Sequence, residues 1–211
     1  MTAREAILGR IRQHLKRSPG AQAATVPDVR LRVPEVASGD RIEAFTKALE
    51  ALTGKVYRAG SSGEAVSYAA DLIGERQAVA SNSPLLHKLG ITALPRVRSG
   101  LVDSEALKQT CAEAAVGVTG VDYALADTGS LVFFASPEEP RLISLLPPVH
   151  LAVVESARIL TGLDELLERT PLPADITSSM VLITGPSRTA DIEQILVRGV
   201  HGPGELHVVI V

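Results

Sequence analysis

The chain has 211 residues, of which 45% are apolar, so it is long and apolar enough for one large folded domain with or without an extension. Its net charge of −3 argues against a dedicated nucleic-acid binder. The single cysteine, Cys111, excludes a disulfide framework and any cysteine-ligated zinc or iron–sulfur site within this chain.

Two further features of composition bear on fold and location. Aromatic residues make up only 3% of the chain, so the core must consist of Leu, Val, Ile and Ala, which favours an α/β protein with buried parallel strands. No apolar run approaches the roughly 20 residues that span a bilayer, and the N-terminus has no apolar secretory segment. We therefore expect a cytoplasmic protein without a membrane span.

Residues 2–17 are predicted to form a helix. Thr2 and Glu5 have the spacing of a capping box, and Ile7, Ile11 and Leu15 fall on one face. The other face is basic: Arg4, Arg10, Arg12, Lys16 and Arg17. A solvated surface is one interpretation of this face, and docking to an acidic partner is the other. The proline- and glycine-containing stretch that follows reads as a linker, which predicts an extension over residues 1–39 and a domain over residues 40–211.

From residue 40 onward the pattern alternates between strands and helices. Helices are predicted at residues 41–52, 64–73, 84–90, 104–115, 163–169 and 190–197. Strands are predicted at residues 55–59, 77–81, 115–119, 130–135, 149–155, 180–184 and 206–211. Such alternation with short connections predicts a mostly parallel sheet covered by helices on both faces.

Three polar segments lie at the ends of predicted strands, and open α/β sheets bind ligands at the carboxyl ends of their strands. The first is within residues 117–134, GVTGVDYALADTGSLVFF, where glycines alternate with small hydroxyls and carboxylates. Asp127 is a candidate proton-transferring group, and Thr128, Gly129 and Ser130 are candidate ligand contacts. The alternative is a turn cluster in which the aspartates cap backbone groups.

The second segment is MVLITGPSRTADIE, residues 180–193, in which a strand is predicted to lead directly into a helix. Backbone N–H groups at a helix start attract anions, and the Arg188 guanidinium suits a carboxylate or phosphate. Ser187, Arg188 and Thr189 are the candidate contacts here. Thr189 also has the chemistry of an N-cap residue, so its role can be purely structural.

The third segment is RLISLLPPVH, residues 141–150, before an apolar strand. Arg141 is a candidate carboxylate ligand or a surface residue. His150, at the border of a buried strand, is interpreted as a hydrogen-bonded structural residue rather than a base. His201 lies between glycines and is the candidate catalytic histidine, with a turn role as the alternative. No metal site and no cofactor are assigned.

Four well-known motifs are absent from the sequence. It lacks a GxxxxGK[ST] phosphate loop, a GxGxxG fingerprint, a GxSxG nucleophile elbow and an HExxH zinc helix. These absences disfavour a P-loop NTPase, an NAD enzyme of the usual type, a serine hydrolase and a zinc protease.

Three long stretches of the chain resemble the lactate-utilization protein C family, whose core is the LUD domain. They are GVTGVDYALADTGSLVFF, PRLISLLPPVHLAVVE and ITGPSRTADIEQILVRGVHGPGELHVVIV. The resemblance implies a three-layer α/β/α sandwich like that of ribose-5-phosphate isomerase, glucosamine-6-phosphate deaminase (NagB/RpiA-like) and CoA transferases. It also implies a role with two iron–sulfur partner proteins that together oxidise L-lactate to pyruvate. The resemblance supplies no catalytic residue for this subunit.

Two functions follow as expectations. The first is a non-redox subunit of the lactate-oxidising system that binds a small carboxylate- or phosphate-bearing metabolite. The alternative is a stand-alone enzyme of the same fold class, acting on a sugar phosphate, an acyl-CoA or a folate. CoA transferases use a glutamate nucleophile, and none of the three segments holds a glycine-flanked glutamate, which counts against that branch.

Overall fold

The computed structural model describes residues 2–15, 37–170, 176–190, 196–199 and 201–211. The chain divides into two units, Met1–Arg30 and Leu31–Val211. In the first unit, α1 (Ala3–Leu15) confirms the predicted N-terminal helix and its capping box, since Thr2 and Glu5 bond each other's backbone N–H groups. The boundary between residues 39 and 40 stays a prediction, because residues 16–36 lie outside the described ranges.

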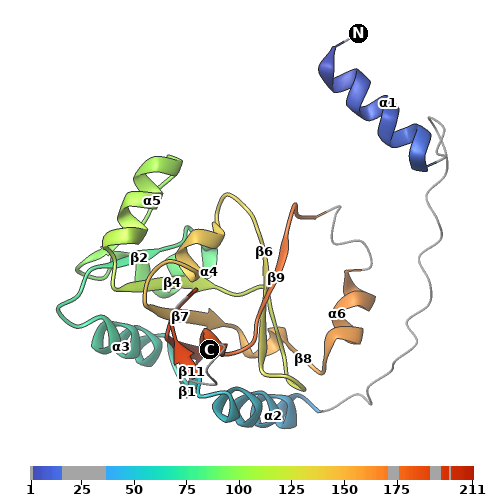
Figure 1. The fold of residues 1–211 in the computed structure, drawn as a ribbon. Helices are drawn as coiled ribbons and strands as arrows, with labels where there is room; N and C mark the ends of the chain where they lie inside the picture. Colours follow the sequence, from blue (N-terminus) through green and yellow to red (C-terminus); the bar gives the residue numbers. More distant parts are fainter. Residues whose placement is uncertain (1, 16–36, 171–175, 191–195, 200) are drawn as a thin grey trace. The chain divides into compact units, whose positions relative to one another are not determined.

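A six-stranded sheet with the order β1-β12-β7-β4-β2-β3 forms the centre of the second unit (Figure 1). Every neighbouring pair in it is parallel, which confirms the predicted α/β class. Its strands are β1 (Lys55–Arg58), β2 (Ala78–Ala80), β3 (Val97–Arg98), β4 (Val116–Gly120), β7 (Val149–Val154) and β12 (Glu205–Ile210).

Helices cover both faces of this sheet. On one face lie α3 (Ser62–Ile73), α4 (Pro84–Leu89) and the 3-10 turn η1 (Ile91–Ala93), packed on alternate side chains such as Val118, Leu151 and Val209. On the other face lie α2 (Ser38–Ala51), α5 (Ser104–Glu113) and the 3-10 turn η2 (Arg141–Ser144). Because successive strand residues point to opposite faces, a buried strand such as β7, which is apolar except for His150, serves both layers.

A second sheet with the order β8-β5-β6-β9 shares the α2 face, which the sequence did not predict. It contains β5 (Tyr123–Leu125), β6 (Ser130–Phe134), β8 (Ile159–Leu160) and β9 (Met180–Ile183), with η3 (Ser156–Arg158) before β8 and α6 (Leu163–Arg169) after it. The β5–β6 and β6–β9 pairs are antiparallel. The face is therefore covered by helices and strands together.

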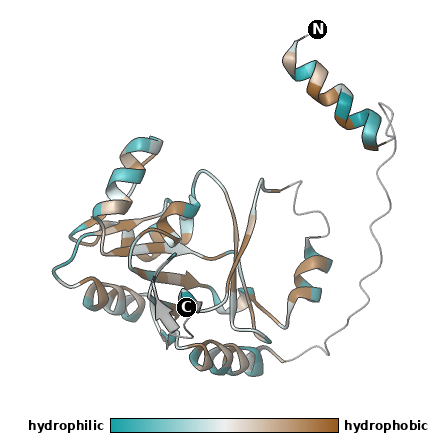
Figure 2. Cartoon of the chain, viewed as in Figure 1, coloured by the Kyte–Doolittle hydropathy of each residue, from teal (hydrophilic) through white to brown (hydrophobic). Residues whose placement is uncertain are grey.

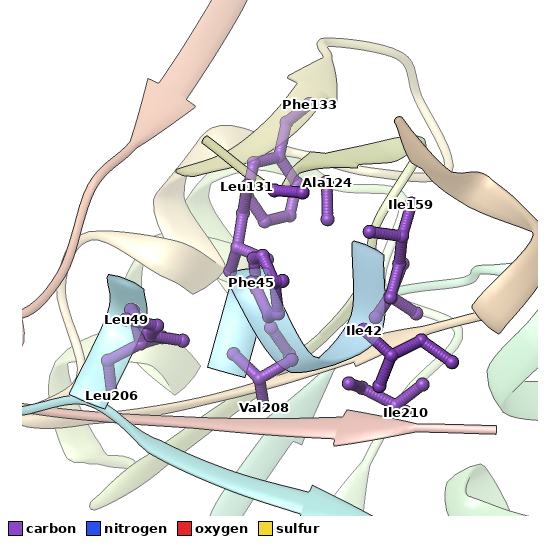
Figure 3. Close-up of a cluster of buried hydrophobic side chains, with 13 residues drawn as sticks. Ile42, Phe45, Leu49, Ala124, Leu131, Phe133, Ile159, Leu206, Val208 and Ile210 are labelled. Carbon is purple, nitrogen blue, oxygen red and sulfur yellow. The ribbon is translucent and has the colours of Figure 1, made fainter. Parts of the chain in front are cut away.

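A core cluster of buried apolar side chains joins these layers (Figure 3). Ile42, Phe45 and Leu49 of α2 point between the strands of the two sheets, and Phe45 and Leu49 are fully buried. Apolar residues spaced three or four apart in α2 form this face, as expected of an amphipathic helix. Burial of each such side chain contributes on the order of 2 kcal/mol.

The predicted helix at residues 190–197 is wrong. Its two ends form an antiparallel hairpin, β10 (Arg188–Ala190) with β11 (Leu196–Arg198), and residues 191–195 lie outside the described ranges. Thr189, the predicted N-cap residue, lies in β10, where it pairs with Val197. The local helical spacing of apolar residues is overridden by pairing between two β-compatible segments. Among the described residues, no helix is long and apolar enough to cross a membrane.

Candidate functional site

A cavity of about 240 Å³ opens at the amino ends of β7 and β12, where the end of β9 meets them. We refer to it as the amino-edge cavity. Its polar lining residues are Ser144, His150, Thr184, Ser187 and His201. Apolar side chains, among them Leu145, Val181 and Leu206, complete the wall. A small recess with an apolar wall and a few hydroxyl and imidazole groups suits a small polar metabolite with an apolar end.

Backbone hydrogen bonds hold two distant segments together at this cavity. The Ser187 N–H donates to the Pro203 carbonyl at 2.9 Å, and the Gly199 N–H donates to the Ser187 carbonyl at 3.1 Å. Gly185 has a φ of +86°, a conformation that glycine adopts without strain, and this lets the chain turn after β9. Ser187 and His201 are thus brought to one cavity, although they are 14 positions apart in the sequence.

A chain of hydroxyl groups runs from the cavity to the turn between β5 and β6. Thr184 lies 2.7 Å from the Ser130 hydroxyl, which lies 2.8 Å from that of Thr128. The Thr128 hydroxyl also donates to Asp127 Oδ1 at 3.2 Å. Asp127 and Thr128 are exposed, whereas Ser130 is buried. The predicted residues of this turn therefore connect to the cavity through Thr184, rather than line it.

His150 is a buried imidazole in the cavity wall. It is 1% exposed, and its Nε2 lies 2.8 Å from the Thr119 hydroxyl. Burial lowers the His150 pKa to about 3, so the ring is neutral at physiological pH. Its Nδ1 is buried without a hydrogen-bond partner. A neutral imidazole with a vacant nitrogen in a cavity wall is a polar group that a ligand can engage after a small side-chain movement.

The other predicted contacts lie elsewhere. Arg141 is exposed at the start of η2, and its guanidinium donates to Ser179 Oγ at 3.4 Å. Arg188 is exposed in β10 and is not among the residues that line the cavity. Gly129 has a φ of +66°, and a Cβ there would lie 2.6 Å from the Leu49 backbone nitrogen. Close packing against α2 thus accounts for a glycine at this position.

The expectation that the candidate segments meet at carboxyl strand ends is wrong for this cavity. Residues 141–148 precede β7, His150 is the second residue of β7, and His201 precedes β12, so they lie at the amino edge of the parallel sheet. Residues 185–189 follow β9, which belongs to the other sheet. The rule for open sheets did not apply because the pocket forms between two sheets rather than along one.

Sequence reasoning missed Thr184, whereas the interpretation of His150 as a hydrogen-bonded residue agrees with its bond to Thr119. Thr184 directly precedes the Gly-Pro-Ser turn, and its hydroxyl at the end of an apolar strand was an available signal. His150 is the second residue of β7, which is otherwise apolar, and a buried polar group in such a position needs a partner. Its partner, Thr119, is 31 positions away, so the pair could be recognised only in three dimensions.

The fold and the site together define a class: an α/β protein with a six-stranded parallel sheet, a smaller second sheet, and between them a small cavity with an apolar wall and a few polar groups. Residues 42–211 match the sequence profile of the LUD domain, and the chain belongs to the LUD domain family.

Comparisons with individual proteins agree with this assignment. The chain is 40% identical over 91 residues to an uncharacterized protein of Neisseria meningitidis, covering 43% of this chain and 39% of that one. It is 32% identical over 136 residues to lactate utilization protein C of Halalkalibacterium halodurans, covering 61% of this chain and 59% of that one. The matches therefore span less than two thirds of the length of these relatives.

A solved structure shares the fold. The crystal structure of a DUF162 family protein from Deinococcus radiodurans superposes with a TM-score of 0.64 at 17% identity. The match covers 83% of this chain and 98% of that one.

Proposed function

We propose that this chain is a non-redox subunit of a lactate utilisation system and that its amino-edge cavity binds a small 2-hydroxy or 2-oxo acid. The names of its relatives support the first part. The observation that carries the second is the meeting of Thr184, Ser187 and His201 in one small cavity with an apolar wall. Hydroxyl and imidazole groups can bind a carboxylate or carbonyl, and the apolar wall accommodates a methyl group.

The chemistry of Cys111 fits a subunit that carries no electrons. Its thiol is buried, and burial raises its pKa to about 11, so it is not a thiolate at neutral pH. Oxidation of a 2-hydroxy acid releases two electrons, which in this proposal pass to the iron–sulfur centres of two partner proteins. This subunit then contributes binding and proton transfer only.

The hydroxyl chain provides a route for a proton. In this proposal, a hydroxyl proton of the ligand passes through Thr184, Ser130 and Thr128 to the exposed carboxylate of Asp127. His201 is the proposed second proton-transferring group. Arg188, next to Ser187, is the proposed cation at the rim, and Arg141 is a more distant candidate.

Ligand-dependent thermal stabilisation tests the proposal. We expect lactate or pyruvate to raise the melting temperature of the chain, with no effect from sugar phosphates or CoA. Ser187→Ala and Thr184→Val should remove this stabilisation, whereas Ser104→Ala, an exposed serine in α5, should retain it. Stabilisation that persists in Arg188→Ala would remove Arg188 from the site. Equal stabilisation of wild type and Ser187→Ala would place the ligand outside the cavity.

Partner binding is tested separately. We expect the chain to copurify with two iron–sulfur partner proteins of the same system. Lactate turnover by the isolated chain, without any cofactor or partner, would contradict the subunit assignment.

A further inference from the structure

The carboxyl edge of the main sheet contains a topological switch point between β2 and β4. These strands are neighbours, but the chain leaves them toward opposite faces. After β2 it enters α4, whose Leu86 packs in the core on the α3 face. After β4 it enters β5, whose Ala124 packs in the core on the α2 face. In open α/β sheets such divergence opens a crevice at the strand ends, and ligands bind there.

Hydrogen-bond donors converge at this switch point. The Gly120 N–H donates to Glu139 Oε1 at 2.8 Å, and the Asn82 N–H donates to the Glu138 carbonyl at 2.9 Å. The hydroxyls of two serines lie beside the Glu139 carboxyl and act to lower its pKa. We call this set of donors the switch-point cradle: the Asn82 and Gly120 N–H groups and the Ser81 and Ser83 hydroxyls.

The cradle depends on the absence of a side chain at Gly120. A Cβ there would lie 2.3 Å from Ser83 Oγ and 2.6 Å from Glu139 Oε1. Any other residue would push the carboxyl group and the serine away from the backbone N–H. The close approach of a carboxyl group to this backbone thus requires glycine at position 120.

The Glu139 carboxyl group does not form aligned hydrogen bonds with all the donors of the cradle. Ser81 is 1% exposed, and its Oγ is buried without an aligned hydrogen-bond partner, as is Glu139 Oε2. Buried polar atoms without partners are rare in proteins and call for an explanation. The carboxyl group of a separate small ligand would align with all the donors, whereas the carboxyl group of Glu139 is held in place by its link to the backbone.

Residues 136–140, which we call the strap, position the Glu139 carboxyl group in the cradle. Ser136, Pro137 and Glu138 are exposed. Burial, the largest influence, raises the Glu139 pKa to about 7, and the nearby Asp122 carboxyl acts in the same direction. Asp122 itself accepts the Phe134 N–H and faces the cationic Arg158. Near neutral pH the Glu139 carboxyl group is therefore close to its pKa. Its ionised form is destabilised by burial, and this favours movement of the strap out of the cradle.

We propose that the switch-point cradle is a second binding site, for the carboxyl or carbonyl group of a small ligand, and that Glu139 is a built-in occupant that this ligand displaces when the strap lifts. The donors, their convergence at a switch point and the incompletely paired serine support this assignment. The cradle lies at the opposite edge of the sheet from the amino-edge cavity, so its test is independent of the proposed function.

Chemical rescue of an emptied cradle tests the proposal. In Glu139→Ala, amide hydrogen exchange in residues 135–140 should become about tenfold faster, the effect of losing one or two modest hydrogen bonds. Excess sodium formate should raise the melting temperature of this variant and slow the exchange of Asn82 and Gly120, whereas sodium chloride at equal ionic strength should not. Wild type and Glu138→Ala, which changes the exposed neighbour, should show no formate-specific shift.

Further variants make the outcome decisive. Glu139→Ala combined with Ser81→Ala and Ser83→Ala should lose the formate effect. If Glu139→Ala does not fold, Glu139→Gln serves instead. Its amide should keep the strap closed, so the protection factors of the backbone amides at residues 135, 136, 138 and 139, which remove the intrinsic pH dependence of exchange, should be equal about one pH unit below and above the wild-type Glu139 pKa. Absence of formate rescue in a folded Glu139→Ala, or equal rescue of wild type and Glu138→Ala, would overturn the proposal. So would pH-dependent opening of the strap in Glu139→Gln.

Discussion

The Ser130 hydroxyl lies 2.7 Å from the Thr184 hydroxyl, and this contact joins the β5–β6 turn to the amino-edge cavity. In the antiparallel register of β6 and β9, Leu131 faces Ile183. Ser130 and Thr184 form the next pair in the same register. Cross-strand pairs of small hydroxyl residues stabilise sheets modestly. Here the pair also links a cavity residue to the exposed Asp127 through a continuous set of hydroxyls.

Thr184→Val should separate the two roles of this contact. The isosteric change removes the hydroxyl from the cavity but leaves Ser130 bonded to Thr128, so we expect unfolding free energy to fall by only about 1 kcal/mol. Stabilisation by lactate or pyruvate should disappear. Chemical denaturation and ligand-dependent melting measure the two effects. Thr92→Val, which removes a hydroxyl bonded to His87 on α4, is the control and should retain the ligand response.

His150 should make the protein less stable in mild acid. Its folded-state pKa of about 3 lies below the unfolded value of about 6.5, so the unfolded chain binds more protons between these values. The contribution of neutral His150 is complete above pH 6.5 and is lost as pH falls toward 3. The slope for one group is at most about 1.4 kcal/mol per pH unit. Denaturation of His150→Gln across this range should show a shallower slope; an unchanged slope would exclude His150 as its source.

Glu139 should make the protein less stable as the pH rises, opposite to the effect of His150. Burial raises its folded-state pKa from an ordinary 4.5 to about 7, so the folded chain binds more protons between these values. Its contribution to stability is complete below pH 4.5 and is lost as pH rises through 7. Glu139→Gln should therefore be more stable than wild type above pH 7, as measured by denaturant unfolding. Glu138→Gln, on the same strap but exposed, should follow the wild-type curve.

The parallel sheet could be predicted from sequence because its signals are local. Buried strands such as β7 are almost entirely apolar, with His150 as the exception, and α3 begins with the Ser61 side chain accepting the Glu64 N–H. Cap residues and apolar periodicity act within a few positions, so they can be read directly. The strands β3 and β8 were missed because each has only two residues, too few for any period.

The site could be predicted only in part because it depends on pairing between distant segments. Ser187 and His201 both line the cavity, but the helix expected between them is replaced at its ends by β10 and β11. Glu139 was missed because nothing in Ser-Pro-Glu-Glu-Pro distinguishes the buried glutamate from its exposed neighbour. Its burial follows from the positions of β2 and β4, which no local pattern encodes.

Gly129→Ala distinguishes a packing role for this glycine from a ligand contact. The residue has a φ of +66°, and an added Cβ would lie 2.6 Å from the Leu49 nitrogen and 2.9 Å from the Ala48 carbonyl carbon. In Figure 1 the turn that contains it reaches toward α2. Because helix backbone cannot yield as a flexible side chain does, we expect strain and overlap together to cost about 2–4 kcal/mol.

Gly90→Ala provides the matched comparison for backbone strain alone. Gly90 ends α4 with a φ of +85°, but no atom lies within 4 Å of an added Cβ. Its substitution should cost only about 1 kcal/mol. In Figure 2 the ribbon of α2 carries both hydrophobic and hydrophilic residues. If Gly129→Ala unfolds at the same denaturant concentration as Gly90→Ala yet loses its response to lactate or pyruvate, Gly129 contacts ligand rather than α2.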